Sequence, residues 1–210
     1  MFRDRLEAGR RLAEKLAGYR GMPDAVVLGI PRGGVVLAAE VAGALAAPLD
    51  VLVVRKVGHP LNPEFAAGAV DPDGGLLVNP FARVSEEEVR RIAERERAEI
   101  ERRLAAYRAG RPPLELRGKT AILVDDGIAT GLTALKAAGY ARDQGAGRVV
   151  VAAAVMSREA REALAEVADE VVAVDVPEPF GAVGQFYREF PQVSDAEVVD
   201  ILAGTPASRT

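Results

Sequence analysis

Short apolar runs alternate with helical patterns along this chain of 210 residues. Runs of mostly Val, Leu, Ile and Ala are typical of strands that helices cover on both faces. Such runs lie at residues 25–29, 49–54, 121–124, 148–155 and 170–174. Helical patterns lie at residues 3–18, 33–46, 132–144 and 158–167. The alternation predicts an α/β fold whose doubly wound, mainly parallel sheet is flanked by helices.

Three segments depart from this rhythm. Residues 59–80 place apolar stretches on both sides of an Asp-Pro-Asp-Gly turn signal and predict a hairpin or mobile loop. Residues 83–109 predict an inserted charged helix, opened by a capping box of Ser85 and Glu88, with solvated outer faces. Residues 176–204 mix prolines with aromatics and predict a small C-terminal hood or flap. A single domain over residues 1–210 accommodates all of these.

Composition excludes several classes of site. The chain has no cysteine and a single histidine, His59, which excludes disulfides, zinc thiolates and multi-histidine metal sites. A formal net charge of −4 gives no electrostatic case for nucleic-acid or membrane binding. The charged N-terminus lacks the apolar core of a signal peptide, so we expect a cytoplasmic protein.

The apolar run at 121–124 is followed by two neighbouring carboxylates, Asp125 and Asp126, and by a glycine and hydroxyl loop that opens a helix at Leu132. Free N–H groups at such a loop and the helix dipole favour a phosphate, while carboxylates accept hydrogen bonds from ribose hydroxyls. Neighbours in a regular strand point to opposite faces, so we expect the strand to end at Asp125. An ordinary strand–turn–helix capped by Asp126 or Thr130 is the alternative. The pattern predicts a cradle for a phosphorylated sugar.

Residues 122–133 closely resemble the phosphoribosyl-diphosphate (PRPP) motif of type I phosphoribosyltransferases. The motif is neither a Walker loop nor a dinucleotide fingerprint. The resemblance implies that Asp125 and Asp126 are catalytic and hold the ribose hydroxyls. It implies PRPP contacts from Asp125, Asp126, Gly127, Ile128, Ala129, Thr130, Gly131, Leu132 and Thr133.

Four further residues are candidates for the diphosphate. Gly29-Ile-Pro-Arg-Gly-Gly34 follows the first strand, and the family contacts diphosphate with the loop in this place. Arg32 offers a planar fork for phosphate oxygens, and Gly33 allows close approach of the backbone. Arg55 and Lys56 are expected to end the second strand at the same edge of the sheet. A surface Arg and two solvated cations are the alternatives.

Three other candidates come from segments that the family uses to close the site. The family has a mobile loop where residues 59–80 lie, and its Glu64 is the candidate carboxylate acting on the incoming base. Family members hold the nucleobase with a variable hood, which makes Phe186 and Tyr187 candidates for stacking on the base. Packing of these aromatics onto the core is an equal alternative.

The resemblance implies transfer of 5-phosphoribosyl from PRPP to a nitrogen nucleophile, most simply a nucleobase, in nucleotide metabolism. Mg²⁺ is the implied cofactor, held through PRPP rather than by direct protein ligation. Ala129 stands where enzymes for 6-oxopurine bases carry a third acid, which weakens that substrate assignment. The alternatives are a non-catalytic regulatory module that binds PRPP or a nucleotide, and an assembly protein with residues 83–109 as its interface. A homodimer is left open.

Overall fold

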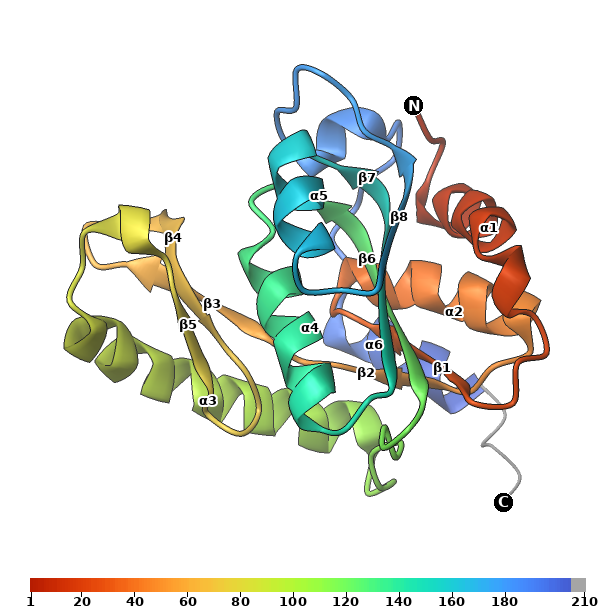
Figure 1. Ribbon diagram of the computed structural model, residues 1–210, viewed down its shortest axis with the longest axis horizontal. Coiled ribbons are helices and arrows are strands. Elements are labelled where there is room, and N and C mark those ends of the chain that lie inside the picture. The colour runs from red at the N-terminus through yellow and green to blue at the C-terminus, as the bar shows by residue number, and fades with distance from the viewer. Residues whose placement is uncertain (205–210) are drawn as a thin grey trace.

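The computed structural model describes residues 1–204, and for Glu64 it describes the backbone alone. Its centre is a five-stranded sheet in the order β2-β1-β6-β7-β8, in which every pair of neighbours runs parallel (Figure 1). The strands are β1 (Ala25–Gly29), β2 (Leu49–Val51), β6 (Thr120–Ile128), β7 (Arg148–Met156) and β8 (Glu170–Asp175). The predicted α/β fold with a mainly parallel sheet is confirmed.

Helices cover both faces of this sheet (Figure 1). One face carries α1 (Arg5–Lys15) and α2 (Gly33–Leu45), and the other carries α4 (Leu132–Asp143) and α5 (Arg158–Ala165). Successive strand residues alternate between the two layers: Ile122 and Val124 join one core, and Leu123 joins the other. Because both faces are buried, the strands have no polar side, which accounts for their continuous apolar sequence.

The strand order changes direction between β1 and β6. The chain leaves β1 for β2 on one side and returns on the other side as β6. The β1–β6 pairing ends at Gly29 and Val124, whereas β6 continues beside β7 to Ile128. The carboxyl ends of β1 and β6 therefore part at the topological switch point, where open α/β sheets bind their ligands.

A second sheet accounts for the segment with the irregular sequence. The strands β3 (Arg55–His59), β4 (Asn62–Val70) and β5 (Leu76–Val78) pair antiparallel in that order. The β4–β5 pair confirms the predicted hairpin. With α3 (Glu86–Arg108) these strands form an arm, residues 55–108, that projects from the central sheet (Figure 1). The strand predicted at 49–54 was wrong in its end, because β2 stops at Val51 and the chain then crosses into the arm.

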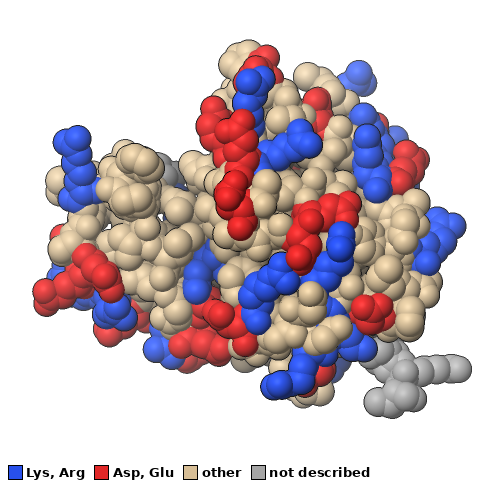
Figure 2. All heavy atoms as spheres, viewed as in Figure 1, with Lys and Arg blue, Asp and Glu red and all other residues tan. Residues whose placement is uncertain are grey.

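The long charged helix of the arm matches its prediction. Ser85 caps α3, accepting a hydrogen bond from the Glu88 amide at 3.2 Å. Its buried residues include Val89, Ile100 and Tyr107, which pack into the core that the arm strands share. Acidic and basic side chains are mixed along its outer face at the lower left of Figure 2, so this face presents no field of one sign.

The hood, residues 176–204, closes the chain against its beginning. It contains the 3₁₀ turn Val183–Phe186 and α6 (Asp195–Gly204); two further 3₁₀ turns lie at Ala17–Tyr19 and Pro80–Ala82. The Phe2 amide donates to the Phe186 carbonyl at 2.7 Å, and the Arg188 amide donates to the Phe2 carbonyl at 2.9 Å. Within residues 1–204, no helix is both long and apolar enough to cross a membrane.

A buried ion pair joins the arm to the central domain. Lys136 of α4 lies 2.7 Å from Asp71, which follows β4, and their side chains are 12% and 3% exposed. The other oxygen of Asp71 accepts hydrogen bonds from the Asp73 and Gly75 amides, so the carboxylate also shapes the β4–β5 turn. Asp71 therefore needs its cation in place, because removing one partner of a buried pair leaves an uncompensated charge.

We expect Lys136→Met to lower the free energy of unfolding by about 3 kcal/mol, the usual cost of breaking a buried pair. Denaturant unfolding followed by circular dichroism measures this change. Arg158→Met is the matched control, since its pair with Glu178 is 60% and 55% exposed, and we expect a change under about 1 kcal/mol. Equal losses in the two variants would contradict a structural role for the Lys136–Asp71 pair.

Candidate active site

The two neighbouring carboxylates, Asp125 and Asp126, form an acid pair beside the start of α2. Gly34 lies so close that a Cβ there would be 2.5 Å from the Val124 carbonyl oxygen and 2.8 Å from the Asp125 Cα. A Cβ on Gly33 would overlap the Asp126 carboxylate. Because Gly33 and Gly34 have no side chains, the start of α2 can lie directly against the acid pair.

The expectation that the strand ends at Asp125 was wrong, because β6 runs on to Ile128 beside β7. The acids nevertheless meet at one place. Past Val124 the strand has lost β1 as a partner, and Asp125 Oδ1 turns back to accept the Asp126 amide at 2.8 Å. That oxygen is 3.2 Å from where a Cβ on Gly34 would stand, so both carboxylates reach the start of α2.

The acid pair is half-buried, and its two negative charges repel each other. Burial raises the pKa of Asp125 well above its usual value, and the neighbouring charge of Asp126 raises it further, while the Arg5 cation opposes the rise. Arg5 Nε lies 2.7 Å from Asp126 Oδ2, and the two side chains are 10% and 14% exposed. Sequence reasoning missed Arg5; the signal was a cation in the first turn of a helix, where the dipole disfavours positive charge.

A loop at residues 129–131, named the phosphate loop after its predicted role, follows the acid pair and the end of β6. Gly131 has φ of 79° and caps α4, a conformation that favours glycine. Ser157 fixes the loop from β7: its hydroxyl donates to the Ala129 carbonyl at 2.6 Å and its amide to the Ile128 carbonyl at 2.9 Å. Thr130 is exposed and Thr133 half-buried. The strand, loop and helix thus have the predicted order, with first-turn amides of α4 facing the loop end.

Arg32 stands at the start of α2, next to the acid pair. It follows a cis peptide bond from Pro31, and its guanidinium lies 3.7 Å from Asp195 at the start of α6. Asp195 also accepts the Tyr107 hydroxyl at 2.6 Å and lies 2.8 Å from Arg102 of α3. Arg32 and Gly33 thus lie at the start of α2 beside the acid pair, and Asp195, which Tyr107 and Arg102 of α3 contact, is the acidic neighbour of Arg32.

The structure places the other diphosphate candidates differently. Arg55 and Lys56 begin β3 of the arm instead of ending a strand of the parallel sheet, so their predicted position was wrong. Arg55 Nε donates to Glu96 of α3 at 2.8 Å. Antiparallel pairing with β4 places these residues in the second sheet, and no pattern in the neighbouring sequence predicts this pairing.

The base-binding candidates belong to the hood. Tyr187 is 6% exposed; its ring lies against Phe2 and Phe190, and its hydroxyl donates to the Asp126 carbonyl at 2.6 Å. Phe186 is half-buried against Phe180. The Tyr187 hydroxyl therefore attaches the hood to the backbone of the acid pair. The Tyr187 ring is taken up by packing against Phe2 and Phe190. Stacking of Phe186 or Tyr187 on a base stays a prediction.

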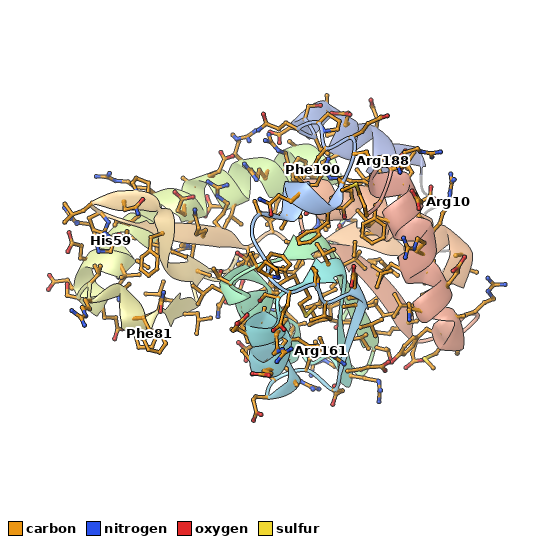
Figure 3. All side chains as sticks on the ribbon, turned by 90° about the horizontal axis from the view of Figure 1, so that it is seen from above. Arg10, His59, Phe81, Arg161, Arg188 and Phe190 are labelled. Carbon is orange, nitrogen blue, oxygen red and sulfur yellow. The ribbon has the colours of Figure 1, made fainter. Side chains whose placement is uncertain are left out.

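The side chain of Glu64 lies outside the described residues, so its predicted role stays a prediction. Its backbone belongs to β4, near the tip of the arm where His59 pairs with Asn62. Figure 3 shows His59 and Phe81 at the far end of the arm from the hood residues Phe190 and Arg188. In this structure the arm tip therefore stands away from the hood.

Comparison with known proteins agrees with this geometry. Residues 3–189 match the family described as the phosphoribosyl transferase domain. Two curated Mycobacterium tuberculosis proteins, both provisionally named phosphoribosyl transferase, are 46% identical over 206 residues. The match covers 96% of this chain and 46% of each relative, so the chain spans about half the length of these relatives.

Solved structures also resemble this chain. The crystal structure of the TT1426 protein from Thermus thermophilus is 48% identical with a TM-score of 0.81, and the match covers 96% of this chain and 97% of that one. The AQ2163 protein of Aquifex aeolicus shares the fold at 13% identity and a TM-score of 0.53, over 86% of this chain and 76% of its own.

We expect Gly34→Ala to lower the free energy of unfolding by about 1–3 kcal/mol, because its methyl group would press α2 away from the backbone of β6. Gly43→Ala on the same helix is the control, since nothing lies within 4 Å of its Cβ position. That variant should gain up to about 1 kcal/mol from helix propensity. Denaturant unfolding of both proteins checks the opposite signs; two changes of the same sign would contradict the close approach.

Proposed function

We propose that this chain, which belongs to the phosphoribosyl transferase family, moves a 5-phosphoribosyl group from PRPP to a nitrogen nucleophile, most simply a nucleobase. The observation that carries the proposal is the acid pair, held against the start of α2 and followed directly by the phosphate loop. Acceptors for ribose hydroxyls and amides for a phosphate then lie on one stretch of chain, as a phosphorylated sugar requires.

In the proposed reaction the bond from ribose C1 to the diphosphate oxygen breaks, and diphosphate leaves with the electron pair. The nitrogen lone pair forms the new bond at C1, and the nitrogen gives up a proton. Positive charge develops on the sugar as C1–O weakens, as in other glycosyl transfers. Asp125 and Asp126 would stabilise that charge, because preorganised carboxylates act strongly in a site with little water.

The remaining groups would position PRPP. The backbone amides of residues 130–133 would hold the 5-phosphate at the start of α4. Arg32, beside Gly33 at the start of α2, would bind the departing diphosphate through its planar fork. The roles of Arg55 and Lys56 at the diphosphate and of Glu64 at the base are weaker proposals, since all three belong to the arm.

Mg²⁺ is proposed as the cofactor that accompanies PRPP. The residues fit an ion held through PRPP, because Mg²⁺ usually takes most of its ligands from substrate phosphates and water, and the nearby Asp125 and Asp126 carboxylates would favour a cation there. When bound with PRPP, the ion would offset the charge of the diphosphate. Among the described residues no group of three or more acidic, His or Cys side chains forms a metal site of its own.

A regulatory module that binds PRPP without chemistry is the second candidate. The burial of Tyr187 favours it, because a ring packed between Phe2 and Phe190 offers little surface to an acceptor base. The two candidates differ in one measurement. Incubation of the protein with PRPP, Mg²⁺ and a panel of nucleobases releases diphosphate if the chain is a transferase. Binding of PRPP without release for any base would support the module.

We expect Asp125→Asn to weaken PRPP binding at least about tenfold, or 1.4 kcal/mol, because a charged acceptor for a ribose hydroxyl is lost. The free energy of unfolding should stay the same or rise, since the change removes one of two buried like charges. Calorimetric titration with PRPP–Mg²⁺ and denaturant unfolding measure the two effects. Unchanged PRPP affinity in a folded Asp125→Asn protein would overturn the assigned site.

A further inference from the structure

Arg5 is a buried cation in an unfavourable place. It is the first residue of α1, where the helix dipole opposes positive charge, and only 9% of the residue is exposed. Burying a charge is costly unless partners compensate it. Arg5 therefore depends on groups outside its own helix.

Three such contacts come from distant parts of the chain. Arg5 Nε donates to Asp126 Oδ2 at 2.7 Å, and a second guanidinium nitrogen donates to the Pro191 carbonyl at 2.6 Å. The guanidinium carbon lies 3.8 Å from the centre of the Phe190 ring, a cation–π distance. One planar group thus joins α1, the acid pair and the hood, whose Phe190 is labelled in Figure 3.

The contact with Asp126 bears directly on the proposed site. The guanidinium donates to one oxygen of the Asp126 carboxylate, Oδ2, and this charge-assisted hydrogen bond restricts the orientation of the carboxylate. It also places a positive charge beside the acid pair, which opposes the rise in the pKa of Asp125.

We infer that Arg5 is a positioning residue for the site: it holds the Asp126 carboxylate in the orientation that receives the ribose, and it ties that carboxylate to the hood. The inference rests on the proposed function, since it takes PRPP as the ligand. Arg5 acts through Asp126 and does not itself contact the reacting atoms. The effect of an Arg5 substitution on PRPP affinity should therefore disappear when the Asp126 carboxylate is replaced.

A double-mutant cycle tests this dependence. The affinity for PRPP–Mg²⁺ is measured by calorimetry for the wild type, Arg5→Gln, Asp126→Asn and the double variant, at a temperature where circular dichroism shows all four folded. We expect Arg5→Gln to weaken binding about tenfold alone, but less than about twofold when added to Asp126→Asn, as for residues that act through one contact. Arg5→Lys, which keeps the charge, should recover part of the loss.

Arg10→Gln is the matched control on the same helix, because its pair with Glu40 is exposed and should leave PRPP affinity within about twofold. Equal losses from Arg5→Gln in both backgrounds, or none in either, would overturn the positioning role while leaving PRPP binding intact. A wild type that binds no PRPP would instead overturn the proposed function, and the inference with it. If Arg5→Gln does not fold, the same cycle with Arg5→Lys decides, with a smaller loss confined to the Asp126 background.

Discussion

The contact between the first turn of α2 and residues 124–126 of β6 determines where every other part of the site lies. Gly34 lets the helix reach the backbone of Val124 and Asp125, and Gly33 leaves room for the Asp126 carboxylate. A helix in this position requires β1 to stop at Gly29, which is where its pairing with β6 ends. The switch point of the sheet, the acid pair and the start of α2 are thus three consequences of one close approach.

The same region of β6 carries two neighbouring negative charges, and the Arg5 cation of α1 partly offsets their repulsion. Two adjacent, half-buried acids repel each other, and burial together with the Asp126 charge raises the pKa of Asp125. The Arg5 cation offsets this, and in doing so it fixes α1 and the hood relative to β6. Tyr187 adds a second attachment of the hood at the Asp126 carbonyl. The N-terminal helix α1, strand β6 and the hood, which are far apart in the sequence, therefore meet at Asp126.

The elements that the sequence predicts well are those set by local pattern. Apolar runs locate β1, β6 and β7 because strands covered on both faces need no polar residues, and Ser85 locates the start of α3 because a hydroxyl caps the helix. Arg55 was misplaced because the run from Leu49 to Val54 contains no signal that it crosses between two sheets. Arg5 was missed because its partners lie 121 and 186 residues away in the sequence.

The segment that was predicted to be mobile belongs to the arm, and contacts at the root of the arm attach it to the central domain. Its root is held to the central domain by Lys136 with Asp71, by Gln144 with Asp73 at 2.8 Å, and by Arg108 with Asp50 at 3.2 Å. Lys136 belongs to the helix that begins at the phosphate loop, so the root and the loop share one rigid element. The β3–β4 register shifts on both sides of Gly58. Bending of the arm at its root would break the buried Lys136–Asp71 pair, which is costly, so the root is a firm attachment.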